Sequence, residues 1–418
     1  MTNHLSSAHV ASRRLRERIN LLADVISRFL HKLQDLFWST YVDELGEEVN
    51  FDFTTHFDSS IIGAFDLYHS CRSIQEHPIP RYNSPIMLTI EETRALGEVH
   101  PEFEPIVRCY NPMLNAWNMD TDLYGIREIM TQVRQARPKP DLDALSYRME
   151  DIKIPLRDGH EVDARVYTPK DAPSDGCPGI IVFHGGGFML GDLDTEAGLC
   201  ATFTDLGGVA VNVDFRHAPE HPFPQAIEDA FDATNWATKN VSKLGIDPAK
   251  GFIIGGTSSG ADMSLAVAHL CQDAGMEPPL TGVYAPITSG VNEETVPEKY
   301  KDHFFSKEQN ANAPVFSTES LKFVHSKYKP DQTSPLAFPV AFPTHVGQPK
   351  TYFQVCGLDP VRDCSLVLEQ VYKDDGVPTK IHIYPGLPHA FWALFPELEI
   401  SSKRQEDVVE GLKWLLEQ

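Results

Sequence analysis

The sequence predicts an α/β protein in which helices flank a mostly parallel sheet. After residue 150, short runs of β-branched residues alternate with helical patterns, and this alternation is typical of a parallel sheet covered on both faces. The chain has 418 residues, 42% of them hydrophobic, which is enough for a large core in one or two domains. We therefore expect an α/β domain over 151–418, preceded by an N-terminal region over 1–150.

The N-terminal region is expected to be mainly helical. Between Leu15 and Leu36, apolar residues recur at steps of three and four with polar residues between them, which is the pattern of an amphipathic helix packed on its own protein. Residues 40–150 are mixed in character and rich in proline, without clear strand alternation. The charged, proline-containing stretch 134–143 is typical of a linker. We interpret 1–150 as a helical cap or extension.

Six strands and four helices are expected in the α/β domain. The strands are Ala164–Tyr167, Gly179–Phe183, Val209–Val213, Phe252–Ile254, Thr351–Val355 and Lys380–Tyr384. The helices are Ala226–Lys239, Ser259–Gln272, Ser365–Asp374 and Gln405–Leu416. Residues 288–345 interrupt this alternation and are polar, proline-rich and partly helical, so we expect an inserted part of the cap there.

A serine flanked by glycines stands between a predicted strand and a predicted helix. The motif GTSSG (256–260) matches G-x-S-x-G in the strand–turn–helix setting that this pattern requires. In that setting a strained turn pushes the serine hydroxyl above the sheet. Ser258 has a glycine two positions before and two positions after it, whereas Ser259 does not. Ser258 is therefore the predicted nucleophile.

A serine nucleophile needs a base, and the base needs a carboxylate that orients it. Asp359 follows one predicted strand and His389 follows the next, so both would lie beside Ser258 at the carboxyl edge of the sheet. Asp363 is a rival acid, but its place at the start of a helical pattern favours a helix N-cap. The rival histidines, which we expect to be packing or surface residues, are His303, His325, His345 and His382.

Three consecutive glycines follow a predicted strand at 185–187. They cost backbone entropy and add nothing to packing, so the bare backbone must have a task. Acyl transfer builds negative charge on a carbonyl oxygen, and backbone amides can stabilise that charge. The predicted donors are the amides of Gly185, Gly186 and Ser259. Phe188 and Met189 would then lie beside the substrate. A phosphate-loop pattern is missing, and the dinucleotide pattern is met only in part.

Charge and cysteine content exclude several classes of partner. The net charge of −23 gives no electrostatic reason to bind nucleic acid or an anionic membrane. No apolar run is long enough for a membrane span, and the N-terminus lacks the apolar segment of a signal peptide. The seven scattered cysteines form no CxxC pair, so we expect no metal site and a reducing compartment. These observations favour a soluble cytoplasmic protein.

Taken together, the motifs over 150–418 resemble the hormone-sensitive-lipase family of α/β-hydrolases. The resemblance depends on H-G-G-G-F from His184, on G-T-S-S-G around Ser258, on D-P-V-R-D from Asp359, and on H-A-F from His389. The stretch that begins at Arg216 is also similar to the family pattern R-x-A-P-E-x-P-F-P. The resemblance implies the α/β-hydrolase fold, with a mainly helical cap made by the N-terminal region and the insertion.

The resemblance also implies a role for each matching residue. Ser258 would be the nucleophile, His389 the general base and Asp359 the orienting acid, with the three amides named above as the oxyanion hole. His184 would brace the glycine loop, and the scaffold would be stabilised by Glu220 and Asp229. The chain departs from the family at Thr257, where the family usually has an acid, and at Ser259, where it usually has alanine.

The function expected from these residues is hydrolysis of a carboxylic ester, such as a short-chain acyl ester, acetyl ester or lactone of a small molecule, through an acyl-enzyme. The mechanism needs no metal or organic cofactor. Relatives with this fold that act as natural-product dehydratases or cyclases provide the main alternative. A non-catalytic receptor is less favoured, because such receptors lack the catalytic histidine that His389 supplies here. The sequence leaves open a homodimer formed through an edge strand or the N-terminal helices.

Overall fold

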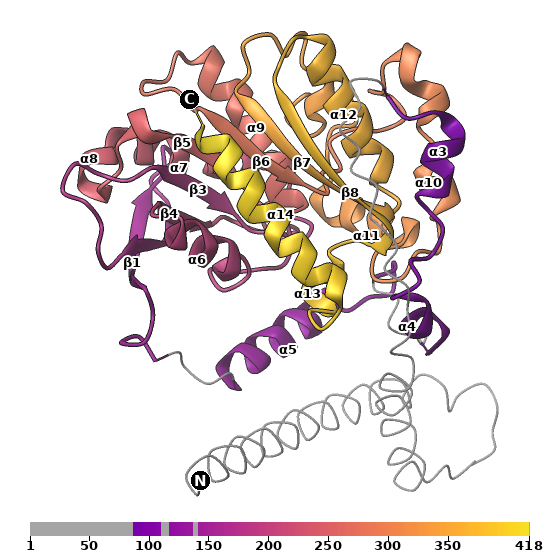
Figure 1. Cartoon of the computed structure of the whole chain (residues 1–418), viewed down its shortest axis with the longest axis horizontal. Coiled ribbons are helices and arrows are strands. Elements are labelled where there is room, and N and C mark those ends of the chain that lie inside the picture. The colour runs from indigo at the N-terminus through magenta and orange to yellow at the C-terminus, as the bar shows by residue number, and fades with distance from the viewer. Residues whose placement is uncertain (1–86, 110–116, 137–140, 418) are drawn as a thin grey trace, which may run out of the picture. The chain divides into compact units, whose positions relative to one another are not determined.

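A computed structural model describes residues 87–109, 117–136 and 141–417 of the chain (Figure 1). The chain divides into two compact units, Met1–Pro78 and Ile79–Gln418, and every described residue belongs to the second. The helix predicted between Leu15 and Leu36 lies outside the described residues. In the described part of the chain, no helix is long and apolar enough to span a membrane.

The described residues are organised around one eight-stranded sheet with the order β1-β2-β4-β3-β5-β6-β7-β8. The strands are β1 Tyr147–Pro155, β2 Glu161–Pro169, β3 Gly179–Phe183, β4 Val209–Asp214, β5 Phe252–Gly255, β6 Gly282–Pro286, β7 Lys350–Leu358 and β8 Thr379–Pro388. β2 pairs antiparallel with both β1 and β4, and the pairs from β4 to β8 are parallel. The carboxyl ends of the parallel strands therefore share one edge of the sheet.

Helices cover both faces of this sheet. The helices are α3 Ile90–Ala95, α4 Glu104–Cys109, α5 Leu123–Ala136, α6 Ala197–Asp205, α7 Gln225–Lys239, α8 Val241–Leu244, α9 Ser259–Asp273, α10 Ser306–Gln309, α11 Thr318–Tyr328, α12 Arg362–Asp374, α13 Phe391–Leu394 and α14 Glu399–Leu416. α7, α9 and α12 share one buried core, and α6 and α14 share the core on the opposite face. Figure 1 shows α14 lying across the sheet.

The side chains of β3 explain why both faces need cover. Ile181 and Phe183 belong to the core beneath α7, α9 and α12, whereas Ile180 and Val182 belong to the core beneath α6 and α14. All five residues of the strand are buried. A strand whose alternating sides are both apolar is stable only between two helical layers. The predicted fold class, an α/β-hydrolase fold with a mostly parallel sheet, is confirmed.

All six predicted strands and four predicted helices are present, with ends that differ by a few residues, but the sequence missed several elements. β1 was missed because it is a partly exposed edge strand with charged residues between its apolar ones. β6 was missed because it is only five residues long and has a glycine and a proline at its ends. α6 begins without a side-chain cap, so no start signal marks it. α5 reaches Ala136 and takes up the first residues of the stretch expected to be a linker.

Two segments outside the regular alternation pack onto the sheet domain. Residues 288–345, between β6 and β7, contain α10, α11 and two short 3-10 helices, η4 Glu298–His303 and η5 Pro339–Ala341. On the N-terminal side, Leu96 and Phe103 are buried in clusters that also contain residues of β7 and β8. β1 begins at Tyr147, a few residues before the boundary expected at 150.

Candidate active site

Ser258 lies in a strained turn between β5 and α9. Its φ of 57° and ψ of −116° are values that residues with a side chain rarely adopt. The two flanking glycines permit this turn because it lies directly against β3. A Cβ atom would lie 1.8 Å from the Phe183 carbonyl oxygen at Gly256 and 2.0 Å from it at Gly260. The glycines therefore permit a contact that no other residue could make without moving the backbone.

The three residues predicted to act on the substrate lie in one hydrogen-bonded chain. His389 Nε2 lies 3.0 Å from Ser258 Oγ, and His389 Nδ1 lies 2.6 Å from Asp359 Oδ2. Asp359 is buried and follows β7, whereas His389 is almost buried and follows β8. Since a carboxylate only accepts hydrogen bonds, Nδ1 carries a proton and Nε2 is left to accept the serine proton. This geometry suits a nucleophile, a base and an orienting acid.

Asp359, the predicted orienting acid, is held from two directions. Its second carboxylate oxygen, Oδ1, accepts the backbone amide of Val361 at 3.0 Å. From the inserted segment, the Asn310 side-chain amide donates to the carbonyl oxygens of Asp359 at 2.9 Å and Gly357 at 3.1 Å. Asn310 is buried, so these bonds are protected from water. No sequence pattern marks Asn310, because its role depends on the position of the insertion over β7.

The rival acid Asp363 has a structural role. Its Oδ2 accepts the backbone amides of Phe305 at 2.8 Å and Ser306 at 2.6 Å, and its Oδ1 accepts Arg362 Nε at 2.7 Å. The expectation that Asp363 caps its own helix is wrong, because α12 begins at Arg362 with Val361 as its N-cap. Asp363 instead satisfies amides at the start of α10.

The rival histidines His325, His345 and His382 contact residues other than Ser258. His382 Nδ1 pairs with the Tyr352 hydroxyl at 2.8 Å, and His345 Nδ1 pairs with His269 Nε2 at 3.0 Å. His325 packs edge-on against Phe338. These contacts agree with the packing roles expected from the sequence.

The glycine loop that follows β3 has little room for side chains. A Cβ at Gly185 would lie 2.8 Å from the Thr257 carbonyl oxygen, and a Cβ at Gly186 would lie 2.1 Å from that of Leu190. Gly186 also has a φ of 128°, which favours glycine. Within the described part of the chain, the amides of Gly186 and Ser259 donate to no protein acceptor. Unpaired amides beside a nucleophile are the donors that an oxyanion hole needs.

A buried carboxyl that the sequence did not single out contacts this loop. Burial raises the pKa of Glu196, and hydrogen bonds from the Thr257 hydroxyl and the Gly185 amide oppose that rise. The Glu196 carboxyl thus lies near the Gly185 amide, one of the three predicted donors. The contact also explains the departure at Thr257, since an acid at that position would face a second carboxyl.

Aromatic side chains from distant segments surround the glycine loop and the base. The Phe188 ring stacks on Tyr328 of α11, with 3.7 Å between ring centroids. Phe316 lies 4.8 Å from the His389 ring and meets Trp117 edge-on at 6.3 Å. Both parts of the chain expected to form the cap thus contribute to these surroundings. Met189 is completely buried, so Phe188 is the better candidate of the pair for contact with a substrate.

A second buried acid, Asp262, lies in the first turn of α9. It accepts hydrogen bonds from the hydroxyl groups of Thr288 and Ser289 and from the Ser289 amide at 2.8 Å. Burial raises the pKa of Asp262 to about 6, and these hydrogen bonds oppose the rise. The charge of His389 is close enough to act on this carboxyl too. The sequence did not identify Asp262, because an acid in a first helical turn is common.

Comparisons with known proteins agree with this arrangement. A family model described as an alpha/beta hydrolase fold matches residues 180–393. An AB hydrolase superfamily protein of Schizosaccharomyces pombe is 33% identical over 325 residues, which cover 76% of this chain and 94% of that protein. Versiconal hemiacetal acetate esterase of Dothistroma septosporum is 36% identical over 275 residues, or 64% and 82% of the two chains. The crystal structure of vibralactone cyclase superposes with a TM-score of 0.69 at 29% identity, covering 81% of this chain and 98% of the other.

Proposed function

The chain belongs to the α/β-hydrolase family, and we propose that it is a serine hydrolase that cleaves the carboxylic ester of a small molecule through an acyl-enzyme. The observation that carries this proposal is the hydrogen-bonded chain from Ser258 through His389 to Asp359, with separations of 3.0 Å and 2.6 Å. Ester hydrolysis is also the activity named for the relative of Dothistroma septosporum.

In the first half of the reaction, Ser258 Oγ attacks the ester carbonyl carbon while its proton passes to His389 Nε2. Asp359 Oδ2 accepts the hydrogen bond from His389 Nδ1–H and stabilises the imidazolium that forms. The tetrahedral intermediate then collapses, the carbon–oxygen bond to the alcohol breaks, and His389 returns its proton to the departing oxygen. In the second half, water takes the place of the serine hydroxyl, and the acid is released with Ser258 restored.

The negative charge of the tetrahedral intermediate needs donors that are already in place. The amides of Gly185, Gly186 and Ser259 are assigned this task. Removing one such donor typically costs a factor of about 100–1,000 in rate. Because these are backbone groups, the glycines contribute by leaving the approach to them unobstructed.

The surroundings of the site favour a small ester with an apolar part. Phe188 and Tyr328 stack beside the glycine loop, and Phe316 lies beside the base with Trp117 packed against it. An aromatic wall suits an aromatic or polyketide-like alcohol combined with a short acyl group. The relative of Dothistroma septosporum is named for an acetate ester, which has a short acyl group.

The proposal is tested with Ser258→Ala and a panel of p-nitrophenyl acetate and butyrate. Loss of the nucleophile is expected to lower kcat by a factor on the order of a million. The activity that remains is the one that the oxyanion hole and substrate binding support without the serine. Ser264→Ala is the matched control, since it removes a serine hydroxyl from the same helix, where Oγ bonds the Gly260 carbonyl oxygen. Hydrolysis by Ser258→Ala at the wild-type rate would refute the assignment.

A second reaction is supported by the likeness to vibralactone cyclase. In this alternative the acyl-enzyme is attacked by a hydroxyl group of the substrate itself, so that a lactone is released in place of an acid. The same three residues serve both reactions, because His389 can deprotonate either hydroxyl. Product analysis after reaction with a hydroxy-acyl ester separates them, since hydrolysis incorporates one oxygen from labelled water and ring closure incorporates none.

We also propose a reducing compartment such as the cytoplasm as the location of the enzyme. Five cysteines of the described residues are buried and unpaired, which suits a chain that does not rely on disulfides. The free cysteines are Cys177, Cys200, Cys271, Cys356 and Cys364. Fractionation of cells that express a tagged chain tests this location.

A further inference from the structure

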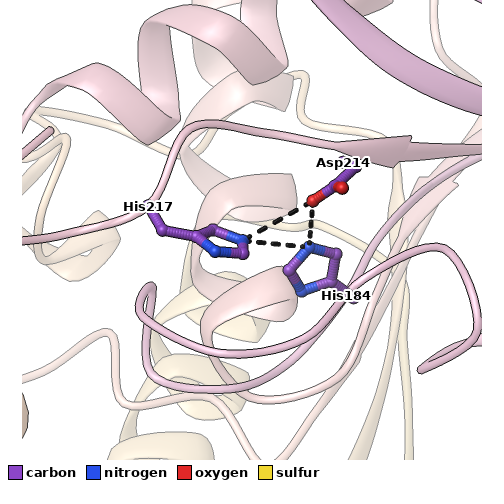
Figure 2. A group of neighbouring side chains, drawn as sticks. All are labelled: His184, Asp214 and His217. Atoms are coloured by element: carbon purple, nitrogen blue, oxygen red, sulfur yellow. Dashed lines mark hydrogen bonds and ion pairs between the residues drawn. The ribbon is translucent and has the colours of Figure 1, made fainter. Parts of the chain in front are cut away.

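Three side chains that the proposed reaction does not use directly converge where β3 and β4 end (Figure 2). His184 Nε2 lies 3.3 Å from Asp214 Oδ1 and 3.4 Å from His217 Nε2, and His217 Nε2 lies 3.6 Å from Asp214 Oδ1. We propose that these three atoms form a binding site for a divalent metal ion of the Zn²⁺ type, distinct from the catalytic triad.

The separations between the three atoms are those of a tetrahedral site. Zinc binds imidazole nitrogen and carboxylate oxygen at about 2.0–2.1 Å, so two ligands at the tetrahedral angle lie about 3.3–3.4 Å apart. The three measured separations, 3.3, 3.4 and 3.6 Å, are close to this value. Octahedral Mg²⁺ at about 2.0–2.1 Å would need ligands about 3 Å apart and prefers oxygen over imidazole. The geometry and the donors therefore favour zinc.

The tautomer of His184 makes its Nε2 a ligand. The other ring nitrogen, Nδ1, lies 3.0 Å from the Gly185 carbonyl oxygen, which can only accept, so Nδ1 carries the proton. The ring is completely buried and stacks on Phe215 with 4.4 Å between centroids, which fixes its orientation. The Nε2 lone pair thus points at the Asp214 carboxylate, another acceptor. A metal-bound histidine typically has such a carbonyl partner on its second nitrogen.

The fourth coordination position is accessible from outside. Asp214 and His217 line an open cavity of about 340 Å³, through which a metal ion and a bound water can enter. The cavity wall also contains the acids Glu161, Asp163 and Glu220. One arginine in this wall, Arg127, is already bound to Glu220 and to two backbone carbonyls, and the other, Arg216, is bound to Asp158 and Asp229. Because both arginines are already paired, neither neutralises Asp214, and its negative charge remains available to bind a cation.

A second group of similar composition lacks these properties. Asp407 and Glu410 lie near His382, but Lys403 binds Asp407 and Lys380 binds Glu410. Two ammonium groups therefore already neutralise the carboxylates. By contrast, the ion pairs that the described residues make with Asp214 involve His184 and His217 alone.

No metal site was expected from the sequence, because that expectation depended only on the absence of a CxxC pair. The ligands here come from the residue after β3, the last residue of β4 and the loop beyond it, and His217 occupies the variable position of the pattern R-x-A-P-E. His184 directly precedes the glycine loop, so a metal ion would tie this loop to the end of β4. Metal binding is thereby expected to stiffen the loop that carries the proposed oxyanion donors.

The test uses the full chain after dialysis against a chelator. Titration calorimetry with Zn²⁺ is expected to find one tight site per chain, and Co²⁺ in its place is expected to give the visible absorption bands of a tetrahedral complex. His217→Leu and Asp214→Asn are each expected to weaken Zn²⁺ binding at least about 100-fold, since each removes one ligand. The Zn²⁺-dependent rise in Tm should disappear with them.

His221→Gln is the matched control, because His221 lines the same cavity but is not one of the three converging residues. It should bind Zn²⁺ as the wild type does. Two results would overturn the proposal: no Zn²⁺ binding by the wild type, or tight binding that His217→Leu leaves unchanged, which would place the metal elsewhere in the chain. If Asp214→Asn does not fold, His217→Leu alone decides between the outcomes. The His217 side chain is partly exposed, so the fold should tolerate its replacement, and leucine cannot bind a metal ion.

Discussion

Single residues decide the geometry at the nucleophile. Ser258 adopts a backbone conformation that costs about 1–3 kcal/mol, and the surroundings must supply that free energy. They do so through contacts that tolerate no side chain, since Gly256 and Gly260 both lie against the Phe183 carbonyl oxygen. The strained serine and the two glycines are therefore one unit, and the strand β3 belongs to it.

A single methyl group at Gly260 tests this unit. Gly260→Ala would place Cβ 2.0 Å from a backbone oxygen that cannot move without moving β3. We expect a loss of about 3–5 kcal/mol in the free energy of unfolding, at the upper end for one substitution, together with loss of ester hydrolysis. Denaturant unfolding monitored by circular dichroism measures it.

Gly198→Ala serves as the control for this substitution. Gly198 lies in α6, where an added Cβ meets nothing within 4 Å. There the change is expected to leave the stability equal or to raise it by about 0.5–1 kcal/mol, as alanine does in a helix. A Gly260→Ala chain as stable as Gly198→Ala would contradict the packing argument.

Among the elements, the segment between β6 and β7 contacts the proposed site at several positions. Phe316 reaches the base, Tyr328 stacks on Phe188, and Asn310 holds the backbone of the catalytic acid. The insertion is thus connected to the proposed chemistry by hydrogen bonds as well as by aromatic contacts.

Asn310→Ala is expected to lower kcat more than its effect on stability suggests. The change removes two buried hydrogen bonds, which costs about 1–3 kcal/mol of stability, and it leaves the Asp359 turn free to shift. A misplaced acid reorients His389, so we expect kcat to fall about 10–100-fold with KM little changed. Steady-state kinetics on p-nitrophenyl acetate measure both constants.

Asn240→Ala is the matched control for this experiment. Its side-chain amide makes a similar bond of 2.8 Å to the Trp236 carbonyl oxygen, at the end of α7 and away from the triad. It should lose stability without losing kcat. Equal kcat for Asn310→Ala and Asn240→Ala would show that Asn310 is only a structural residue.

For the whole molecule, buried histidines predict sensitivity to acid. Burial and, to a smaller extent, the neighbouring His345 lower the pKa of His269 to about 3, and burial lowers the pKa of His325 to about 4. In the unfolded chain these groups titrate near about 6.5. Between the two values the unfolded chain binds protons that the folded chain does not. The stability present above about pH 6.5 is therefore lost as the pH falls toward 3–4.

His269→Gln isolates one of these contributions. The amide keeps a donor for His345 Nδ1 but does not titrate, so the free energy of unfolding should fall less steeply with acid, by up to about 1.4 kcal/mol per pH unit. Denaturant unfolding of both chains from pH 7 to pH 4 gives the two slopes. Parallel slopes would contradict the buried neutral state of His269.

The sequence predicted the fold class because strand and helix periods are local properties, and it predicted Ser258, Asp359 and His389 because each follows a recognisable strand. The structure then places His389 Nε2 3.0 Å from Ser258 Oγ and His389 Nδ1 2.6 Å from Asp359 Oδ2. It could not predict Asn310 or Asp262, whose partners lie far away in the sequence. The elements it missed, such as β6, are short or lack end signals, so no local pattern distinguishes them.

The bonds from Asn310 also limit how this enzyme can be re-engineered. Exchanging the lid of one relative for that of another is an obvious route to a new substrate range. In this chain such a graft would remove the side chain that supports the catalytic acid together with the wall of the pocket. A chimera would then lose turnover for a reason unrelated to substrate fit. A donor lid would have to bring an amide to the same place, or the loop after β7 would have to be exchanged with it.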